Sequence, residues 1–575
     1  MAAAPKIKDL QYEIERLKKE LVDARTSRPY GLVWEDKPEQ FEKDAENALP
    51  VLVEKGGKFK DVVLEPEEDY NVLIEGDNYH SLSVLSYTHK GKFDVIYADP
   101  PYNTGNSSWR YNNDYVEKDD IFRHSKWLSF MYKRIDLAKD LLKDDGIFVL
   151  TIDDYELFAA GLLLDRVFGE ENRIGVIAIE TNPRGRTTNT FFATSHEYIL
   201  VYAKRAEEAT IDFKDLTEEQ MGAFDLEDEI SKYRLLPFRR SGGLSTREER
   251  PNSFYPIYFD AKSNKISIEN FKGAVEILPI DSEGRERVWR QTRPSLLAAI
   301  RRGDMVIKSN GTKYTVLMKD RIKEGRKAKT VWIDPKYDAS SHGTVLIQTI
   351  LGKRKVFDYP KSLYAVLDTL GVLIKSKKDA KVLDFFAGSG TTAQAVLQMN
   401  DDDGGDRSFV LCTNNENKIC EEVTYERIRA VMSGYKGKRD ERVAGLGGNL
   451  KYLKTDFVPR HVEYGLTDEA RMDLTRQANL LLALKENTFT KEDLTDSYEI
   501  FSSTTHLTGV YFTEDKRDLD AMLKALKKRA KGKVVNVYIF SWEKGAYKAG
   551  FEEYPEFHFE DIPEPILDVY RSIGY

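Results

Sequence analysis

Residues 70–154 alternate apolar and polar positions in a way that predicts strands and helices in turn. Short apolar runs bounded by turn residues indicate buried strands, whereas apolar positions three and four apart indicate helices. Strands are predicted at YNVLIEGD (70–77), FDVIYADPP (93–101) and GIFVLTIDD (146–154), and helices at NYHSLSVLSYTH (78–89) and KWLSFMYKRIDLAKDLL (126–142). This alternation is typical of a parallel α/β sheet with crossover helices.

The same pattern returns at residues 362–433 after a long interruption. KVLDFFAGSGTTAQAVLQM (381–399) predicts a strand, a glycine turn and a helix, and SHEYILVYAK (195–204) predicts the strand that ends the first half. In between, residues 205–340 lose the alternation and carry many arginine, aromatic and turn residues. We therefore expect an inserted domain between two halves of one sheet.

The two ends of the chain differ from this pattern. Residues 5–24 predict a helix with a short heptad seam, which fits docking on its own domain as well as a dimer contact. Residues 25–70 predict a loop-rich arm. At the other end, HLTGVYF (506–512), DLDAMLKALKKRA (518–530) and KVVNVYIFSW (533–542) predict a small strand–helix–strand unit before an acidic tail.

The distribution of charge points to a partner that the net charge conceals. The 575 residues have a net charge of −9, and 41% of them are hydrophobic, which is enough for several cores. Residues 231–330 nevertheless hold 23 Lys and Arg against 11 Asp and Glu, while residues 551–575 hold 1 Arg against 7 acidic residues. A basic middle section of this kind suits a nucleic acid.

Several protein classes are excluded by what the chain lacks. Its two cysteines, Cys412 and Cys420, are too few for a disulfide scaffold or a cysteine-rich zinc site, and no HExxH or EF-hand pattern indicates a metal. No GxxxxGK[ST] pattern indicates an ATP-driven motor. No apolar run approaches the roughly 18 residues of a membrane span. We expect a cytoplasmic protein without a membrane contact.

The first motif with clear chemistry is Asp99-Pro100-Pro101-Tyr102, at the end of a predicted strand. Ligands of open α/β sheets bind beyond the carboxyl ends of the strands. There, the Asp99 carboxylate and the Pro100 carbonyl can accept the two hydrogens of an amino group. The prolines stiffen the loop, and Tyr102 offers a ring for stacking. The alternative is a rigid turn without a ligand.

Two further strand ends carry motifs that bind nucleotide-like ligands. In DFFAGSGTT (384–392), the glycines permit close approach of a ligand, and the following helix N-terminus favours a carboxylate. Glu75-Gly76-Asp77 ends another strand, where an acidic side chain can accept a hydrogen bond from a nucleoside amine. Each motif alone also fits an unliganded turn.

Together, these motifs resemble the amino-methyltransferases of DNA. DPPY precedes FAGSG, which resembles the order of the β class, and DPPYNTGN (99–106) with RHSKWLSFMYKR (123–134) is similar to the modification subunit of type III restriction–modification systems. IEGDNYHSLSVL (74–85), YPKSL (359–363) and NENKICEEVTYERI (415–428) extend the resemblance. It implies a site-specific enzyme that transfers a methyl group from S-adenosylmethionine to adenine N6 in duplex DNA after base flipping.

The resemblance also implies the architecture. We expect an α/β fold with a Rossmann-like methyltransferase sheet in circularly permuted order, an inserted DNA-recognition domain and a small α+β C-terminal domain. The expected segments are an N-terminal helix and arm at 1–60, a catalytic half at 61–204, a target-recognition insert at 205–345, a cofactor half at 346–455, and a C-terminal domain with an acidic tail at 456–575.

Site roles follow from the resemblance by position. The catalytic pocket comprises Asp99, Pro100, Pro101 and Tyr102, with Phe191 or Phe192 as a second stacking face for the flipped base. Residues expected to bind the cofactor are Asp77, Lys361, Ser362, Asp384, Phe386, Ala387, Gly388, Ser389, Gly390 and Thr391. Asp77 is expected at its adenine end, and Lys361 and Ser362 flank its carboxylate.

Two details of the resemblance concern single residues. The family usually has an acidic residue for the ribose hydroxyls after the strand that follows FAGSG, but FVLCTNNEN (409–417) offers either Glu416 or Asn414. Asp in the first position of DPPY resembles adenine enzymes, whereas Ser there resembles N4-cytosine enzymes.

The basic insert is the expected DNA-reading surface, because arginine contacts both phosphates and guanine. The candidates are Arg239, Arg240, Arg247, Arg250, Arg287, Trp289, Arg290 and Arg293. Alternatively, part of this set is a solvated face. Expected partners are double-stranded DNA, a second copy of the chain and a separate helicase–nuclease restriction subunit. Other readings are a methyltransferase without a restriction partner, a non-catalytic specificity subunit, and a methyltransferase of RNA or protein amides.

Overall fold

The computed structural model describes residues 34–37, 39, 41, 48–65, 69–111, 114–117, 120–185, 191–311, 313–323, 325–459 and 467–573. The predicted heptad helix at 5–24 lies outside these residues. Two compact units are present, one from 1–212 and 329–575 and the other from 213–328, and each is described by itself. The second unit falls inside the range predicted for the insert.

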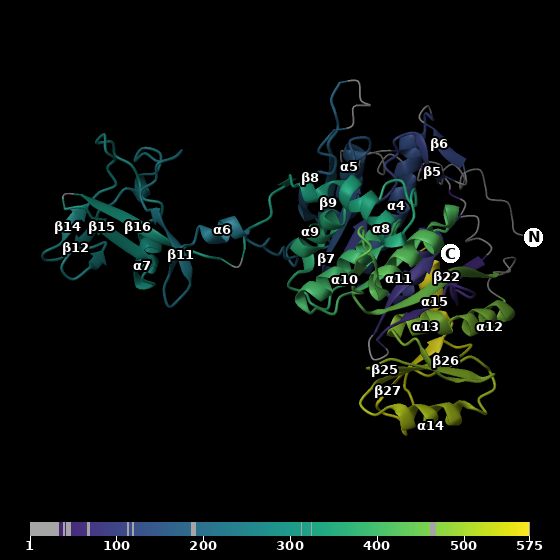
Figure 1. The fold of residues 1–575 in the computed structure, drawn as a ribbon. Helices are drawn as coiled ribbons and strands as arrows, with labels where there is room; N and C mark the ends of the chain where they lie inside the picture. The colour runs from purple at the N-terminus through teal and green to yellow at the C-terminus, as the bar shows by residue number, and fades with distance from the viewer. Residues whose placement is uncertain are drawn as a thin grey trace, which may run out of the picture. The chain divides into compact units, whose positions relative to one another are not determined.

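An 11-stranded sheet forms the centre of the first unit in the described part of the chain (Figure 1). Its order is β1-β22-β3-β19-β18-β4-β7-β9-β8-β17, with β2 paired to β22. The strands from β22 to β7 run parallel, and β9 is antiparallel to both neighbours. The bounds are β1 (Ala48–Glu54), β2 (Val62–Val63), β3 (Tyr70–Glu75), β4 (Phe93–Ala98), β7 (Leu142–Ile152), β8 (Arg173–Glu180), β9 (His196–Ala203), β17 (Val331–Trp332), β18 (Lys381–Asp384), β19 (Ser408–Thr413) and β22 (Asn449–Pro459).

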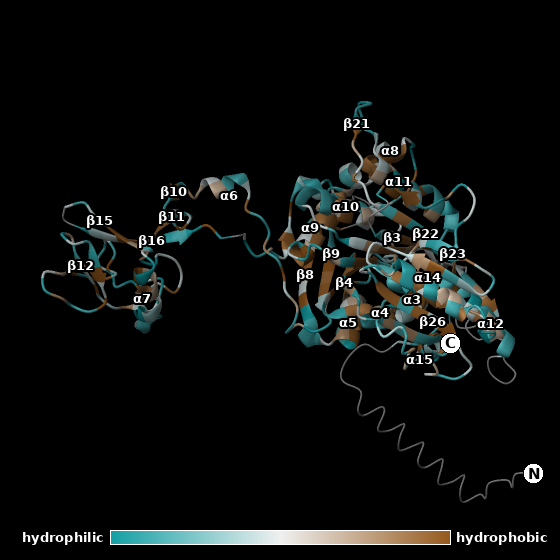
Figure 2. Cartoon of the chain, turned by 90° about the horizontal axis from the view of Figure 1, so that it is seen from below, coloured by the Kyte–Doolittle hydropathy of each residue, from teal (hydrophilic) through white to brown (hydrophobic). Residues whose placement is uncertain are grey.

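Helices cover both faces of this sheet (Figure 2). One layer contains α3 (Asn78–Thr88), α4 (Arg123–Leu141) and α5 (Leu157–Phe168), and the other contains α8 (Val345–Leu351), α9 (Leu363–Ile374), α10 (Thr391–Asp403) and α11 (Glu426–Ser433). In α4, Trp127, Met131, Ile135 and Ala138 repeat at helical spacing and are fully buried against the sheet. The predicted α/β alternation is confirmed.

The predicted loop-rich arm is wrong for residues 48–54. These residues form β1, which pairs antiparallel with β22 at the edge of the sheet. Val51 and Leu52 are buried there, and they bring apolar side chains into the core from a segment whose flanking charges suggested a loop.

The second unit contains two small antiparallel sheets and its own core. One sheet has the order β10-β11-β16-β15, and the other β13-β12-β14. The core gathers buried aromatic and aliphatic side chains, including Phe238, Tyr255 and Trp289. The elements are α6 (Glu218–Gly222), β10 (Leu226–Glu227), β11 (Lys232–Pro237), β12 (Ile257–Asp260), β13 (Lys265–Ser267), β14 (Val275–Ile277), α7 (Arg293–Arg301), β15 (Met305–Ser309) and β16 (Tyr314–Arg321).

The C-terminal part of the first unit forms a five-stranded sheet of order β23-β24-β25-β26-β27. The predicted strand–helix–strand unit is confirmed as β25, α14 and β26. The elements are α12 (Asp468–Gln477), α13 (Asn479–Glu486), β23 (Thr490–Leu494), β24 (Tyr498–Ser502), β25 (His506–Tyr511), α14 (Leu519–Arg529), β26 (Val534–Phe540), β27 (Phe557–Ile562) and α15 (Glu564–Ser572). Two hairpins complete the described elements: β5 (Asn106–Tyr111) with β6 (Asp114–Glu117), and β20 (Tyr435–Lys436) with β21 (Arg442–Val443).

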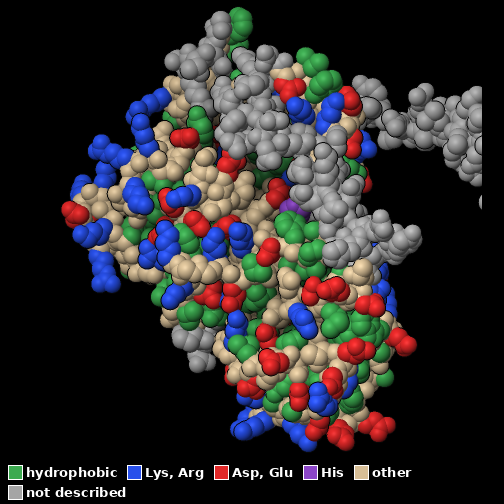
Figure 3. Space-filling view, turned by 90° about the vertical axis from the view of Figure 1, so that its right-hand side faces the viewer, with side chains coloured by type: hydrophobic (Ala, Val, Ile, Leu, Met, Phe, Trp, Pro, Cys, Tyr) green, Lys and Arg blue, Asp and Glu red, His purple; other side chains and the backbone are tan. Residues whose placement is uncertain are grey.

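The acidic C-terminus is not a tail. Its residues form β27 and α15, and the buried Tyr570 hydroxyl donates to the Pro50 carbonyl at 2.6 Å. Apolar positions at helical spacing in α15 face the core, Asp568 lies nearer the surface, and the largely buried Glu564 pairs with Arg471 at 2.9 Å. Figure 3 shows acidic side chains recurring over the lower part of the molecule, where this sheet lies. None of the described helices is long and apolar enough to cross a membrane.

Candidate functional site

The two motifs meet because their strands are neighbours in register. β18 and β4 pair in parallel, with Val382 opposite Val95 and Leu383 opposite Ile96. Asp99 and Phe386 each follow three residues after the last of these pairs, and paired strands lie about 4.8 Å apart. The negative charge of Asp99 contributes to the raised pKa of Asp384, which also indicates that the two strand ends are close. The DPPY loop and the glycine loop thus share one edge of the sheet.

The DPPY loop is fixed from behind by buried side chains. Trp127 Nε1 donates to the Pro101 carbonyl at 2.7 Å. Asn103 has a φ of +56° and donates from Nδ2 to Glu156 Oε1 at 2.5 Å, and that oxygen also lies 2.6 Å from His124 Nδ1. Glu156 and Asn103 are almost fully buried. These contacts hold the loop in one conformation. Reasoning from the sequence assigned no role to the supporting residues Trp127, Glu156 and His124.

The Asp99 carboxylate is partly buried and has two close partners. Thr151 Oγ1 donates to Asp99 Oδ1 at 2.6 Å, and Lys361 Nζ lies 3.2 Å from the same oxygen. Burial raises the pKa of Asp99, and the Lys361 charge opposes that rise. The carboxylate therefore stands at the strand end with one oxygen engaged by the protein.

Lys361 and Tyr102 form a compact cluster with Glu197. Lys361 Nζ lies 2.6 Å from Glu197 Oε2, and the Tyr102 hydroxyl donates to the same oxygen at 3.1 Å. Lys361 also contacts the Tyr102 hydroxyl and lies 4.4 Å from its ring centroid. Burial raises the pKa of Tyr102 well above its usual value, so the phenol stays protonated. The structure thus places Lys361 against the DPPY loop. Glu197 was not singled out from the sequence.

The glycine loop adopts a conformation that only glycine favours. Gly388 has a φ of +47° and Gly390 a φ of +76°, both in the left-handed region. An added Cβ on Gly390 would lie 3.3 Å from Thr424 Cγ2. The loop is tied down by a hydrogen bond from Thr424 Oγ1 to the Gly388 carbonyl at 2.6 Å and by one from the Ala387 amide to the Cys412 carbonyl at 3.1 Å.

A buried arginine holds the far side of this loop. Arg427 has no exposed surface, and its described partners are neutral: it donates to the Ser389 carbonyl, to the Ser389 and Thr391 hydroxyls and to Gln394 Oε1. Burial lowers the pKa of Arg427 to about 9. Ser389 and Thr391 therefore face the protein through their side chains. Nothing in the local sequence marks Arg427 as a support of the loop.

Asp384 lies beneath the loop and braces it. Its carboxylate accepts from the Phe386 amide at 2.9 Å and from Thr392 Oγ1 at 2.6 Å. Burial raises its pKa to about 7. Phe386 packs with its ring centroid 5.9 Å from that of Phe130.

Asp77 and Glu416 follow two adjacent strands. β3 and β19 pair in parallel, with Glu75 opposite Thr413, so the segments after them lie at the same edge. Asp77 caps α3 by accepting from the Tyr79 amide at 2.7 Å, and its side chain is 46% exposed. Glu75 is instead buried between Lys55 and Tyr452, which gives it a structural role.

The remaining cofactor and stacking candidates differ in exposure. Ser362 is buried and donates to the Lys336 carbonyl at 2.8 Å. Phe191 and Phe192 are 90% and 86% exposed, so they are not part of a core. They precede β9, and the Asn182 amide bonds the Ser195 carbonyl at the base of their connection. The end of β8 and the start of β9 lie at the sheet edge that also carries Asp99.

The predicted DNA-binding residues of the insert differ in what their side chains contact. Arg247 pairs with Glu286 at 3.0 Å and Arg287 with Asp281 at 2.9 Å. Arg239, Arg240 and Arg290 donate to backbone carbonyls, Arg293 lies over the Tyr255 ring, and Arg250 is half-buried. Trp289 is 2% exposed and stacks on Phe238, so burial in the core leaves it no face for DNA, and its assignment as a DNA contact is wrong.

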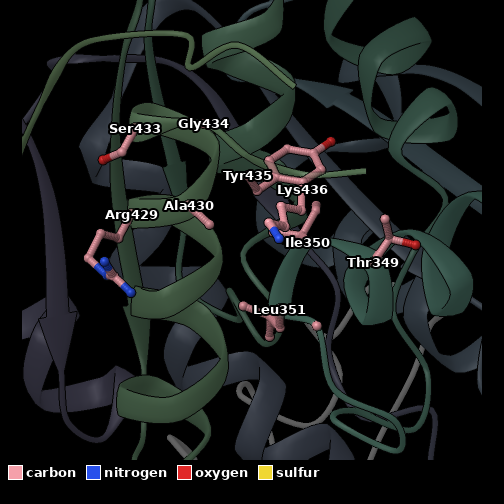
Figure 4. A pocket seen from close by; sticks show the side chains of 10 residues that line it. Thr349, Ile350, Leu351, Arg429, Ala430, Ser433, Gly434, Tyr435 and Lys436 are labelled. Carbon is pink, nitrogen blue, oxygen red and sulfur yellow. The ribbon is translucent and has the colours of Figure 1, made fainter. Parts of the chain in front are cut away.

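The hollow shown in Figure 4 lies elsewhere in the first unit. It has a volume of about 320 Å³ and is lined by the ends of α8 and α11 and by β20, including Leu351, Arg429 and Tyr435. None of the predicted catalytic or cofactor residues lines it. Within the described ranges, no group of three or more His, Cys, Asp or Glu side chains is placed to hold a metal ion.

Comparison with known proteins agrees with the motifs. The family model N6_N4_Mtase, described as DNA methylase, matches residues 93–425. The chain is 35% identical over 387 residues to the type II methyltransferase M.KpnI of Klebsiella pneumoniae, covering 67% of this chain and 90% of that protein. It is 31% identical over 396 residues to the EcoPI Mod subunit of Escherichia phage P1, a type III restriction–modification enzyme, covering 61% of this chain and 58% of that subunit.

Among solved structures, the crystal structure of the M1.HpyAVI–SAM complex matches with a TM-score of 0.30 and 12% identity over 62% of this chain and 98% of that one. The family model spans more than half of the chain and includes both the DPPY loop and the glycine loop. The chain belongs to the N6/N4 DNA methylase family and is an S-adenosylmethionine-dependent DNA methyltransferase.

Proposed function

We propose that the chain methylates N6 of adenine in duplex DNA at a specific sequence, after flipping the base out of the helix. The observation that supports this most directly is the position of Asp99, which ends the strand next to the glycine loop in matching register. A donor of methyl groups held by one loop and an amine held by the other would lie within one strand spacing.

The glycine loop suits the methionine end of S-adenosylmethionine. Gly388 and Gly390 remove the side chains that would fill the turn, and α10 begins directly after it. Among the described residues, no side chain caps this helix, so its first backbone N–H groups remain for a carboxylate. The nucleoside of the cofactor would bind at the neighbouring strand ends. Asp77 follows one of these strands, and Glu416, or alternatively Asn414, follows the other. When bound, S-adenosylmethionine supplies an electrophilic methyl group.

The DPPY loop suits an exocyclic amine, which is a poor nucleophile because its lone pair is delocalised into the ring. Asp99 Oδ1 is engaged by Thr151 and Lys361, and among the described residues Oδ2 remains for an amine hydrogen. The Pro100 carbonyl takes the second hydrogen, and Tyr102 stacks on the base. Two acceptors turn the nitrogen lone pair out of the ring plane and towards the methyl donor. Asp in the first position of the motif supports adenine over cytosine.

A base in this pocket must leave the duplex first. The exposed Phe191 and Phe192 support a second stacking face for the flipped base at the same edge. Exposed aromatic rings contribute little to stability unless they contact a partner.

The insert is proposed to choose the DNA sequence. Of the predicted arginines, those that pair with no carboxylate among the described residues are the better candidates for phosphates and guanines, because Arg247 and Arg287 would first have to give up an ion pair. Those candidates are Arg239, Arg240, Arg250, Arg290 and Arg293. Deletion of residues 205–340 should abolish site choice while cofactor binding persists, and loss of both in a folded protein would contradict this division.

A type III arrangement is the proposed biological setting, with a second copy of the chain and a separate helicase–nuclease subunit. The similarity to the EcoPI Mod subunit supports it. The similarity to M.KpnI over 90% of that protein supports the second candidate, a methyltransferase without a restriction partner. The genes beside this one distinguish the two.

Methylation-aware sequencing of DNA from cells that express the chain tests the proposal. We expect N6-methyladenine at one recurrent sequence with the wild-type chain and none with Asp99→Ala. Modified cytosine at a recurrent sequence, or equal methylation of RNA and duplex DNA by the purified protein, would contradict it.

A further inference from the structure

Two charged residues outside the DPPY loop and the glycine loop reach the DPPY loop from neighbouring elements. Glu197 is the second residue of β9, whose antiparallel direction brings its first residues to the edge where β4 and β7 end. Lys361 stands two residues before α9. Its Nζ lies between two carboxylates, 2.6 Å from Glu197 Oε2 and 3.2 Å from Asp99 Oδ1.

We propose that Lys361 and Glu197 are positioning residues for methyl transfer: Lys361 keeps Asp99 ionised, and Glu197 holds Lys361 and Tyr102 in place. This inference rests on the proposed function. It also gives Lys361 a different role from the one that the family resemblance implied, which was to flank the cofactor carboxylate.

The chemistry requires an ionised Asp99. A carboxylate accepts hydrogen bonds at both oxygens, whereas a protonated acid turns one oxygen into a donor and loses acceptor strength towards an amine. The Asp99 side chain is only 25% exposed, so burial favours its neutral form. An opposite charge within a few ångströms opposes this preference, and Lys361 supplies it.

Apart from Lys361, the titratable groups that interact with Asp99 in the described part of the chain are acids or phenols. Tyr97 of β4, Tyr102 of the loop, Asp384 of β18 and Glu197 of β9 interact with it electrostatically. Beyond β7, Asp153 interacts with Glu197 and Lys361. Lys361 thus provides the positive charge in a group of acids and phenols.

Glu197 fixes the geometry of this cation. Its Oε2 accepts from both Lys361 Nζ and the Tyr102 hydroxyl, so one oxygen sets the position of the cation and the position of the stacking ring. Its own negative charge acts on Asp99 in the direction opposite to that of Lys361. The two residues therefore have effects of opposite sign on the ionisation of Asp99.

Opposite signs give a sharp test. The single-turnover rate of methyl transfer to duplex DNA is measured against pH for the wild type, Lys361→Met, Lys361→Arg and Glu197→Gln. In Lys361→Met the acid limb should move to higher pH by roughly one to three units. Lys361→Arg keeps the positive charge, so the acid limb of its pH profile should stay near that of the wild type. Glu197→Gln should move the acid limb to lower pH.

A matched control comes from the other end of β4. Lys377 also lies between two carboxylates, 3.3 Å from Asp94 Oδ1 and 2.6 Å from Asp145 Oδ2, far along the strand from Asp99. Lys377→Met should leave the pH profile unchanged. Binding of S-adenosylmethionine to Lys361→Met, measured by calorimetry, should match the wild type.

Four results would overturn the proposal. Weaker cofactor binding with an unshifted profile in Lys361→Met would assign this lysine to the cofactor. Equal losses at every pH in Lys361→Met, Lys361→Arg and Glu197→Gln would indicate a general structural role. If the wild-type protein transfers no methyl group at any pH, the proposed function fails as well. If the wild type transfers methyl groups but the variants show no shift in the acid limb of their pH profiles, this inference alone fails.

Discussion

Gly390→Ala should weaken cofactor binding in addition to destabilising the fold. Gly390 has a φ of +76°, where an L side chain costs about 1–2 kcal/mol. Its new Cβ would lie 3.3 Å from Thr424 Cγ2 and 3.6 Å from the Thr424 carbonyl, so the loop must move by a few tenths of an ångström. Thr424 Oγ1 donates to the Gly388 carbonyl at 2.6 Å, which passes the movement to the whole turn.

Gly404→Ala is the matched control on the same helix. Gly404 ends α10 with a φ of +66°, but an added Cβ meets no atom within 4 Å. Both variants should therefore lose about 1–2 kcal/mol in the free energy of unfolding. Displacement of the loop should cost in addition about one hydrogen bond to the cofactor, roughly 1.4 kcal/mol or a tenfold rise in Kd.

Calorimetric titration with S-adenosylmethionine and urea unfolding measure the two effects separately. We expect a tenfold weaker Kd for Gly390→Ala and a wild-type Kd for Gly404→Ala. A wild-type Kd in Gly390→Ala, or an equal loss of affinity in both variants, would refute the assignment of this turn to the cofactor.

Three further predictions concern stability and DNA binding. Burial raises the pKa of Asp384 from 3.8 to about 7, so the folded chain holds an extra proton between these pH values and its stability falls as the pH rises through them. The free energy of unfolding should fall by at most about 4 kcal/mol across this window, and urea unfolding of Asp384→Asn should not show that fall. Trp289→Ala should destabilise the second unit by about 3–5 kcal/mol, seen as faster proteolysis within 213–328 while cofactor binding persists. In a fluorescence titration, Arg240→Gln should weaken binding to all DNA sequences or relax the choice at one base. Arg285→Gln should bind DNA as the wild type does, because Arg285 already pairs with acidic residues.

The sequence predicts that the DPPY loop and the glycine loop share one edge of the sheet, and the pairing of β18 with β4 confirms this placement. Apolar runs that end in Asp99-Pro100 and in Asp384-Phe385 identify two strand ends, and parallel strands bring such ends to one edge. Register between β18 and β4 depends on long-range pairing, and only the structure supplies it.

Contacts between distant segments lie outside the reach of pattern reasoning. Glu197 and Lys361 are 164 positions apart, and each is an ordinary charged residue in its own segment. Trp289 shows the opposite error, because an aromatic residue among arginines suits a DNA surface and a buried core equally well from sequence alone. Burial decided between them, since its ring packs on Phe238.

Local charge also suggests the wrong structure at both ends of the described chain. Residues 48–54 and 557–572 lie in charge-rich stretches that suggested an arm and a tail, yet they form β1, β27 and α15. In both segments apolar side chains are buried in the core, as four consecutive residues in β1 and as helically spaced residues in α15.

The identity of the methylated base tests the central claim most directly. Purified wild-type chain and Asp99→Asn are incubated with duplex DNA and S-adenosylmethionine carrying a labelled methyl group, and the digested nucleosides are separated by mass spectrometry. The account predicts label in N6-methyldeoxyadenosine with the wild type and none with Asp99→Asn, whose amide turns one acceptor into a donor. Label in N4-methyldeoxycytidine, or undiminished transfer by Asp99→Asn, would contradict it.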